Sequence, residues 1–284
     1  MTPVATLYGR QILVRLDPGD GGDVRELRGL RVHATTKKAA SSTPATCTVE
    51  IYNAADDSIS AMVKANSVIE VWAGYAGQNA DGALDPQRLG VPQLIWRGNP
   101  VYGGVKTESR PPDSILTIES SDGGHVVSTG RGSISFTTQT TIAQIIVEAL
   151  RQTGIPSDVT DYPATVYPAG FRFVGKCSDL FTQLAVTTGQ TWYIRDGAFN
   201  FAGEGTAESV LLSSSTGMVG SPNPKSDGSV EVKTLLNPAI RVGGSIELQS
   251  TYTNGAFTVQ SIETDIDSGF SAPFYMTLTC IKKG

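Results

Sequence analysis

Residues 229–283 alternate apolar and polar side chains in short runs separated by turn-forming residues. In the first run Val230 and Val232 alternate with Glu231 and Lys233. Successive side chains of a strand point to opposite faces, so this pattern predicts a sheet that is covered on one face. Five such runs, which together predict a small β-barrel, lie at residues 229–233, 240–242, 245–249, 257–266 and 274–280.

Three details refine the prediction for this C-terminal part. Asn254 and Gly255 tolerate positive φ and predict the turn of a hairpin. The apolar positions change parity between Val259 and Ile262, which predicts a β-bulge in that strand. Residues 213–224, which precede this C-terminal part, are rich in Ser and Pro and predict an irregular connection.

Residues 10–122 also have strand composition. Short runs rich in Val, Ile, Thr, Tyr and Trp predict a second barrel or a sandwich. Residues 17–23 predict a turn, residues 55–65 predict one short helix, and the Gly- and Pro-containing residues 75–92 predict a long loop. The predicted strands lie at residues 11–16, 30–35, 46–52, 68–74, 93–98, 101–107 and 114–120.

Residues 128–205 change to a helical period. A capping hydroxyl at Thr140 precedes an apolar stripe and Gly154 follows it, which predicts a helix between them. Asp196 and Gly197 predict the turn of a hairpin. A second helix and the two hairpin strands complete a small α+β unit, at residues 178–189, 191–195 and 198–202.

The predicted fold class is therefore mainly β with a small α+β unit. Two small β-barrels, one N-terminal and one C-terminal, are expected to flank the middle α+β domain. The predicted boundaries are an N-terminal β-barrel domain at residues 1–126, a middle α+β domain at residues 127–205 and a C-terminal β-barrel domain at residues 206–284.

Composition excludes several classes of partner. The chain has 284 residues and a net charge of −5 from 27 acidic and 22 basic residues, and its basic residues do not cluster. Sequence-specific nucleic-acid binding is therefore not expected. No apolar run approaches the ~20 residues of a membrane helix, and the first residues lack a signal-peptide pattern. We expect synthesis in a cytoplasm and no direct membrane insertion.

The cysteines indicate packing rather than chemistry. They are odd in number, far apart in sequence and outside any Cys-x-x-Cys or Cys/His cluster. Neither a disulfide nor a zinc site is expected. The three residues, which we expect to be small buried hydrophobes, are Cys47, Cys177 and Cys280.

A search for catalytic groups finds no convincing constellation. His33 lies in a predicted strand and is expected to be exposed or hydrogen bonded, and His125 follows a turn without triad geometry. The acidic residues lie in turns or on polar strand faces, and residues 17–23 lack the spacing of a calcium loop. Gly103-Gly104 and Gly243-Gly244 lead into predicted strands, which excludes a phosphate cradle.

The tryptophans Trp72, Trp96 and Trp192 have apolar neighbours and are expected to pack in the core. No catalytic, cofactor-binding or metal-binding residue is therefore predicted, and no cofactor. The chain is expected not to be an enzyme, and a binding or structural role is favoured.

Five segments in order resemble the baseplate hub family of tailed bacteriophages. Residues 46–62 are similar to a strand ending in Ile-Tyr-Asn followed by a short helix, although Ala54 stands where the family tends to have Leu. Residues 68–98 are similar to the paired strands that follow in that family, and residues 141–154 are similar to its helix. Residues 178–201 are similar to its helix with a hairpin, and residues 235–255 to its final strand pair. The resemblance covers about residues 11–282 and is to the contractile-tail hub family, related to the hub part of type VI secretion spikes.

The resemblance implies a structural virion protein of the tail baseplate, made in the bacterial host cytoplasm. It implies a homotrimer in which two barrels per subunit form a ring of six β units, with the α+β units outside. The ring would join the tail tube, or a tube-adjacent protein, to the central spike protein, contact other baseplate proteins and let DNA pass. The spike and any lysozyme domain would then be separate chains.

Three alternatives stay open at the level of sequence. A distal tail or tube-capping protein would share the barrels, although the middle α+β unit favours a hub. A tail-associated cell-wall hydrolase would need a carboxylate or metal site, which is not visible in the sequence. A carbohydrate-binding tip module would use Trp72, Trp96 or the loop predicted at residues 75–92.

Overall fold

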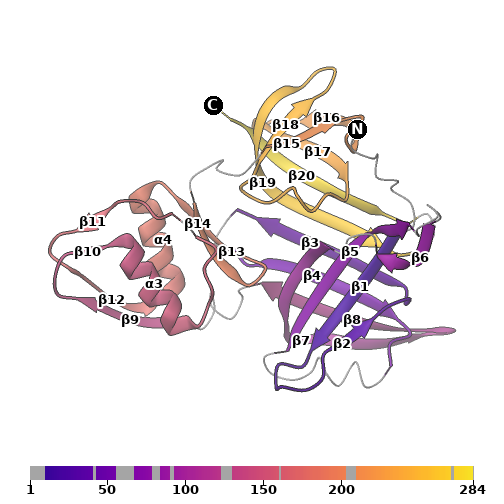
Figure 1. Cartoon of the computed structure of the whole chain (residues 1–284), viewed down its shortest axis with the longest axis horizontal. Coiled ribbons are helices and arrows are strands. Elements are labelled where there is room, and N and C mark those ends of the chain that lie inside the picture. The colour runs from indigo at the N-terminus through magenta and orange to yellow at the C-terminus, as the bar shows by residue number, and fades with distance from the viewer. Residues whose placement is uncertain are drawn as a thin grey trace.

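The computed structural model of the protein describes residues 10–40, 43–55, 67–78, 84–89, 93–122, 130–159, 161–202, 209–269 and 272–283. Two β units lie one above the other, and a smaller unit with both described helices lies to one side (Figure 1). The predicted class, mainly β with a small α+β part, is therefore confirmed.

Three groups of elements follow one another along the chain. The N-terminal β unit contains β1 (Arg10–Asp17), β2 (Arg25–Leu27), β3 (Val32–Ala39), β4 (Ala45–Tyr52), β5 (Val68–Gln78), β6 (Leu84–Leu89), β7 (Gln93–Arg110) and β8 (Asp113–Asp122). The α+β unit contains β9 (Arg131–Phe136), β10 (Thr140–Thr141), α3 (Ile142–Thr153), β11 (Val166–Tyr167), β12 (Phe171–Lys176), α4 (Cys177–Thr188), β13 (Thr191–Arg195) and β14 (Ala198–Ala202). The C-terminal β unit contains β15 (Val210–Ser213), β16 (Met218–Pro224), β17 (Ser229–Leu235), β18 (Ser245–Gln249), β19 (Asn254–Asp267) and β20 (Phe274–Lys282).

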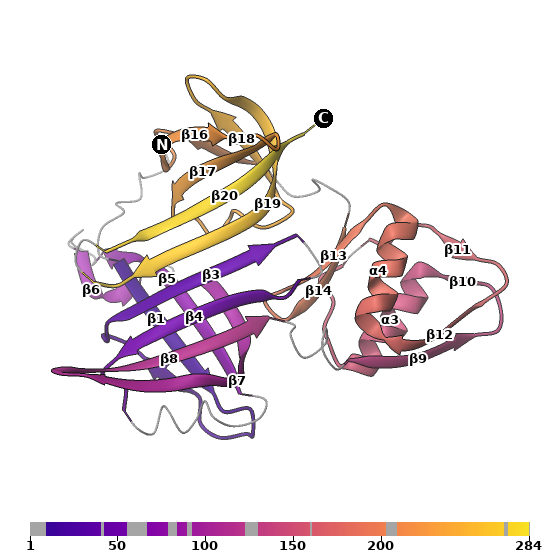
Figure 2. The ribbon, with the colours of Figure 1, turned by 180° about the vertical axis from the view of Figure 1, so that it is seen from behind.

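One 14-stranded sheet runs through both β units. Its main path is β16-β17-β20-β19-β3-β4-β8-β7-β5-β1-β2, and β6, β15 and β18 branch from it. The halves meet where β19 pairs antiparallel with β3, from Ser261 opposite Ala39 to Asp267 opposite His33. We call this pairing the seam; Figure 2 shows the two strands side by side. The described strands form no closed barrel, so the two separate barrels predicted from the sequence are not confirmed.

The seam exists because β19 is long. Its 14 residues pair with β18 near the start of the strand, and its later residues pair with β20 on one edge and with β3 on the other. The backbone N–H and C=O groups of a buried strand need hydrogen-bond partners, and the edge of β3 supplies them to the later residues of β19. The two β units consequently share one hydrophobic core, which extends from Val14 and Ile51 to Leu248 and Leu278.

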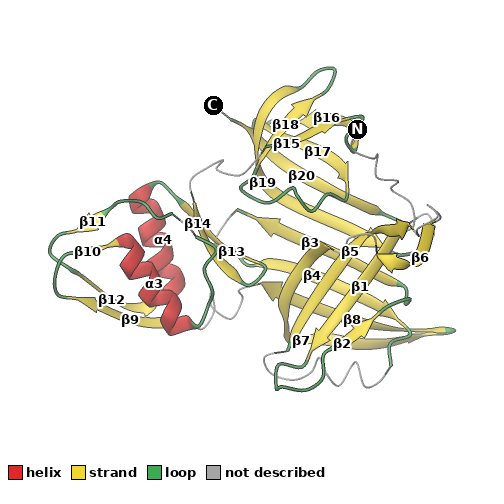
Figure 3. Ribbon diagram, viewed as in Figure 1, coloured by secondary structure: helices red, strands yellow, loops and turns green. Residues whose placement is uncertain are grey.

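The α+β unit has a core of its own. Its buried side chains come from both helices, from β9 and from the hairpin β13–β14, and Phe181, Trp192 and Phe199 form its aromatic centre. Figure 3 shows the two helices packed together, with short strands around them. The hairpin reaches from this unit toward β3 and β4 of the N-terminal β unit (Figure 2).

Local signals for the helices are confirmed with small shifts. Thr141, not Thr140, caps α3 and forms a capping box with Gln144, and Gly154 ends the helix in the left-handed conformation. α4 begins at Cys177 and Gly189 ends it in the same way. The bulge is confirmed as well, since the β19–β20 register shifts between Val259 and Ser261.

Four predictions for the β units are wrong. Residues 240–242 form no strand, because Pro238 and Gly243 place them in consecutive turns, although Ile240 and Val242 are buried. The turn predicted at Asn254-Gly255 lies at residues 250–253 instead, and Asn254 begins β19. Residues 213–224 are not wholly irregular, because β15 and β16 occupy most of them.

The fourth error is the long loop expected at residues 75–92. β5 continues to Gln78 and pairs there with β6, so much of this stretch is strand. The two strands predicted at residues 93–98 and 101–107 are a single strand, β7, whose register with β8 shifts between Pro100 and Val105. The helix predicted at residues 55–65 lies almost wholly outside the described residues. Neither of the helices described combines the length and apolarity needed to cross a bilayer.

The register of β18 predicts different effects of substitution at two neighbouring residues, Glu247 and Leu248. Leu248 is fully buried opposite Gly255, whereas Glu247 lies on the other face of the strand and is only partly buried. Leu248→Asp would place a carboxylate in the apolar core and remove the leucine contacts, so the free energy of unfolding should fall by about 3 to 5 kcal/mol. Thermal melting measures the loss.

Glu247→Lys is the matched control and should fold with nearly unchanged stability, because its side chain does not enter the core. Equal loss at the two positions would show that the register of β18 is wrong.

Candidate functional site

A strip of paired charges covers the outer face of the seam. His33 of β3 lies between two carboxylates, with Nε2 at 2.9 Å from Asp265 Oδ1 and Nδ1 at 3.4 Å from Glu50 Oε2. At one end of the strip the Arg31 guanidinium contacts the Asp267 carboxylate at 3.0 Å. At the other end Lys37 lies 3.4 Å from Glu263. Each pair that crosses from β3 to β19 adds a specific side-chain contact to the backbone ladder.

The prediction that His33 is an exposed or hydrogen-bonded structural residue is confirmed, since both ring nitrogens have carboxylate partners. Burial alone would lower the pKa of the imidazole, but the hydrogen bonds to Asp265 and Glu50 outweigh it and raise the pKa of His33 above its usual value. The protonated ring is therefore the form that binds β4 and β19 together. His125 lies outside the described residues.

A second group of polar contacts holds the hairpin β13–β14 on the N-terminal β unit. Lys38 Nζ lies 2.8 Å from Asp196 Oδ1 and 5.7 Å from the centre of the Trp96 ring. Beside it the Gly197 N–H donates to Asp122 Oδ1 at 3.0 Å. The turn residues Asp196 and Gly197 thus form both contacts. Asp196 tolerates its positive φ of 52°, and the turn presents its backbone N–H groups to the sheet.

Asp122 is the least favourable group in this contact. Asp122 has a relative exposure of only 2%, and its Oδ2 has no hydrogen-bond partner among the described residues. Burial raises the pKa of Asp122 to about 6, while the Gly197 N–H and the nearby Lys38 partly offset that shift. Above pH 6 the ionised carboxylate therefore lowers the stability of the folded protein, and below pH 6 its protonation removes this cost.

A cavity of about 390 Å³ opens where the three units meet. The seam side supplies Lys38, Ile262 and Thr264, the N-terminal β unit supplies apolar side chains around Ile95, and the hairpin supplies Tyr193. Charged side chains of the α+β and C-terminal units, Asp158, Arg195, Asp196 and Arg241, also lie in the lining, together with apolar side chains of the C-terminal unit. Arg195 and Asp158 already contact each other at 3.4 Å, so the charges of the rim are partly neutralised.

The remaining candidate groups have structural partners. The turn at residues 17–23 is a plain turn in which Asp17 and Asp20 accept hydrogen bonds from the N–H groups of Gly19 and Gly22. No group of three or more His, Cys, Asp or Glu residues gathers to hold a metal within the described ranges. Glu119 and Glu231 lie in ion pairs with Lys106 and Lys225.

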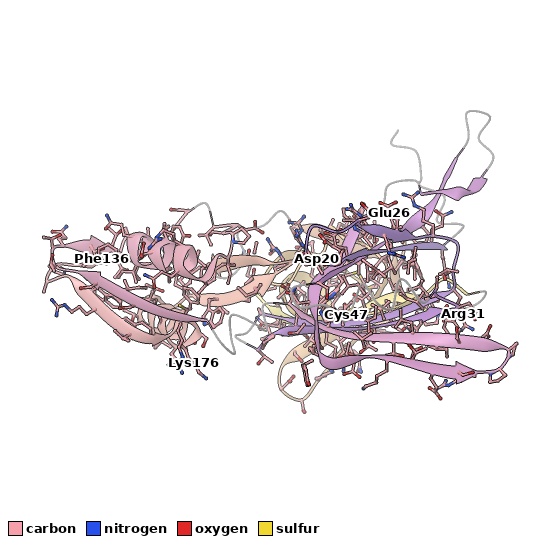
Figure 4. The ribbon with its side chains drawn as sticks, turned by 90° about the horizontal axis from the view of Figure 1, so that it is seen from below. Asp20, Glu26, Arg31, Cys47, Phe136 and Lys176 are labelled. Atoms are coloured by element: carbon pink, nitrogen blue, oxygen red, sulfur yellow. The ribbon has the colours of Figure 1, made fainter. Side chains whose placement is uncertain are left out.

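The aromatic and sulfur residues confirm the packing interpretation except at Trp72, which was expected in the core and is only half-buried. Trp96 is fully buried and Trp192 nearly so, with its indole N–H donated to Thr182, whereas Trp72 is half-buried and donates to Glu70 at 3.0 Å. Cys47, Cys177 and Cys280 are free and buried, and Cys47 lies among the strands in Figure 4. Burial raises the pKa of Cys47 and of Cys280 to about 12, so these thiols are protonated and unreactive at neutral pH.

Sequence reasoning missed the residues that hold the units together. Asp196 and Gly197 were identified only as a turn, and no signal assigned a role to Lys38 or Asp122. Lys38 is 158 residues from Asp196 and Asp122 is 75 residues from Gly197. No local pattern reports such a contact. The available hints were the Lys37-Lys38 pair at the end of β3 and the acidic Asp122 at the end of β8, and charged residues at strand ends are common on surfaces.

The shifted pKa of His33 makes a prediction with a defined sign. A histidine whose folded pKa is raised contributes stability below its unfolded pKa of about 6.5, and this contribution is lost as the pH rises through the folded pKa. His33→Ala should therefore lower the melting temperature more at pH 5.5 than at pH 8.5. An equal loss at both values would contradict a role for the imidazolium at the seam.

The opposite sign is expected for Asp122. A carboxyl whose pKa rises from 3.8 to about 6 on folding destabilises the folded state increasingly as the pH rises from about 4 through 6. Asp122→Asn keeps an oxygen for the Gly197 N–H and removes the charge, so we expect the free energy of unfolding to rise by about 2 kcal/mol at pH 8 and to change little at pH 4. Denaturant unfolding of both proteins at the two pH values checks this, and a destabilised variant at pH 8 would contradict it.

Comparison with known proteins connects this architecture to phage tails. The sequence model of a family described as Baseplate hub gp41 matches residues 12–280. A search of curated protein sequences found no significant match. The tail protein from Neisseria meningitidis MC58 has a similar structure, with a TM-score of 0.65 at 10% identity, and the match covers 98% of this chain and 98% of that chain.

Two further structures share the fold. The 43 kDa tail protein of prophage MuSo2 from Shewanella oneidensis matches with a TM-score of 0.63 at 9% identity, over 96% of this chain and 97% of that chain. The E. coli c3393 protein, described as a component of the type VI secretion system, matches with a TM-score of 0.57 at 11% identity, over 90% of this chain and 74% of that chain. At such identities these likenesses show the fold alone. The match of the family model to residues 12–280 shows that the protein belongs to the Baseplate hub gp41 family, a family of structural bacteriophage tail proteins.

Proposed function

We propose that this protein forms the hub ring of the tail baseplate, a homotrimer that joins the tail tube to the central spike and lets DNA pass. The seam carries the proposal: pairing of β3 with β19 joins the N-terminal and C-terminal β units into one sheet with one core. A subunit built in this way supplies two β units in a fixed relative position. Three subunits then supply the six units that a sixfold tube requires.

The proposed division of the chain follows the same plan. We assign residues 1–126 to an N-terminal barrel-like domain, residues 127–205 to a middle α+β domain and residues 206–284 to a C-terminal barrel-like domain. The separate hydrophobic core of the α+β unit supports its assignment as a domain outside the ring. The hairpin β13–β14 would then be the strut that fixes the outer domain to the ring, through Lys38 and Asp122.

The proposed partners are the tail tube or a tube-adjacent protein, the central spike protein and other baseplate proteins, and the proposed location is the virion. The E. coli c3393 protein is described as structurally similar to the T4 tail proteins gp27 and gp5, which supports a place at the junction of hub and spike. The proposed role is structural rather than enzymatic. The net charge of −5 supports passage of DNA, because an anionic surface does not bind phosphates.

The oligomeric state gives the direct test of this function. The purified protein, alone or mixed with its spike protein, should have three times the mass of a single 29.9 kDa chain when measured by light scattering. Negative-stain images should show a ring with an open centre. A monomer in both samples, or a hexamer that would fit a tube cap instead, would contradict the proposed hub.

A further inference from the structure

The ribbon formed by β9 and β12 has one apolar face and one exposed face. Gly132 and Ile134 of β9 point toward the helices and are buried, and the alternate positions face outward. The register pairs the two strands antiparallel from Arg131 opposite Lys176 to Phe136 opposite Phe171. The six outward, exposed residues are Arg131, Ser133, Ser135, Arg172, Val174 and Lys176.

This exposed face places like charges side by side. Arg131 and Lys176 are direct cross-strand neighbours, and Arg172 lies on the same face of β12. None of the three cations forms an ion pair with a described residue, although acidic residues outnumber basic ones in the chain. Like charges directly opposite each other destabilise a β-ladder. Figure 4 shows Lys176 pointing away from the ribbon.

The two edges of the ribbon differ. At the β9 edge the Gln152 side chain binds the backbone of Ser133, accepting from its N–H at 2.9 Å and donating to its carbonyl oxygen at 3.0 Å. Ser133 therefore directs its backbone groups away from β12, which makes Ser133 and Val174 a non-hydrogen-bonded pair of the ladder. The Cys177 N–H bonds to the Gly130 carbonyl, as the same alternation requires.

The alternation leaves the β12 edge open. By the same parity the N–H and C=O groups of Arg172 and Val174 and the N–H of Lys176 point outward from β12, and no described residue bonds to them. The Lys176 C=O lies at the N-cap of α4 and accepts the first hydrogen bond of that helix. Val174, at the centre of this edge, has a relative exposure of 83%. Cations at an edge commonly prevent pairing with another basic or neutral strand, but they attract an acidic one, and Val174 between them leaves room for it.

We propose that the open edge of β12 binds an extended acidic segment of another protein, which adds to the ribbon as a third strand. The incoming backbone would bond to the outward groups of Val174 and its neighbours, and acidic side chains would neutralise Arg131, Arg172 and Lys176. Strand addition takes its affinity from main-chain hydrogen bonds and its specificity from alternate side chains. A nucleic acid or a lipid lacks the alternating N–H and C=O groups that this edge matches.

The test uses the full-length protein and fluorescent capped heptapeptides. The acidic probe alternates Glu and Val, the basic probe alternates Lys and Val, and a twenty-nucleotide oligothymidine represents single-stranded DNA. Fluorescence anisotropy should show binding of the acidic peptide, weaker binding at higher salt and no binding of the basic peptide. Light scattering measures the oligomeric state in a separate experiment. Peptide binding therefore tests the edge of β12 whether or not the protein forms a trimer.

Val174→Pro removes one outward N–H without removing a ladder bond to β9, and proline is tolerated at a strand edge. Binding of the acidic peptide should weaken at least tenfold in Val174→Pro and stay unchanged in Val174→Thr, which keeps the N–H. Arg172→Glu should also weaken binding, whereas Lys282→Glu, the same charge change on exposed β20, should not. Circular dichroism of each variant confirms that it is folded.

Each of the following results would overturn the proposal: no binding of the acidic peptide, equal binding by Val174→Pro and Val174→Thr, or equal effects of Arg172→Glu and Lys282→Glu. Binding of the oligothymidine in preference to the acidic peptide would also overturn it, and would indicate that the cations bind phosphate. If Val174→Pro is unfolded, the comparison of Arg172→Glu with Lys282→Glu decides.

Discussion

The antiparallel pairing of β3 with β19 is the contact on which the arrangement of this protein depends. It joins residues more than 220 positions apart in the chain and merges two groups of strands into one sheet. Without it β19 would present a long open edge to water, and β3 would lose one of its two neighbours. Each strand therefore satisfies the backbone groups of the other, and the apolar side chains behind them form a single core.

The side chains of β3 serve two different contacts according to their position. His33 and Lys37 point to the outer face and contact carboxylates across the seam. Lys38, on the other face, reaches the hairpin of the α+β unit. One short strand thus contacts all three units. The burial of Asp122 beside Lys38 is unfavourable, because desolvation raises the pKa of the carboxyl while the described residues donate a hydrogen bond to only one of its oxygens.

Local structure could be predicted from the sequence, and long-range structure could not. Thr141 and Gly154 define α3 through capping, and Asp196-Gly197 defines a hairpin turn, because those signals act within a few residues. Local signals also failed in two places. The strand expected at residues 240–242 is replaced by turns at Pro238 and Gly243, and the loop expected at residues 75–92 contains the pairing of β5 with β6. The β9–β12 ribbon was missed, since its alternation is short and half of its outward residues are serine or valine.

The same limit applies to the candidate site. Composition and spacing predicted no catalytic constellation. His33 is hydrogen bonded, and Trp96, Trp192 and the three cysteines are buried, as expected, whereas Trp72 is only half-buried. Lys38, Asp122 and Gly197 could not be connected, because only the folded sheet brings β3, β8 and the hairpin together. The family resemblance supplied the biological setting that the residues alone did not.

Hydrogen exchange of the backbone amides tests the seam most directly. If β3 and β19 form one sheet, the amides of residues 34–38 and 262–266 should exchange slowly and lose protection together, at the same denaturant concentration as the core of β4 and β20. Fast exchange in β3 while β4 stays protected would contradict the account, because it would show that the two β units separate and do not share a sheet.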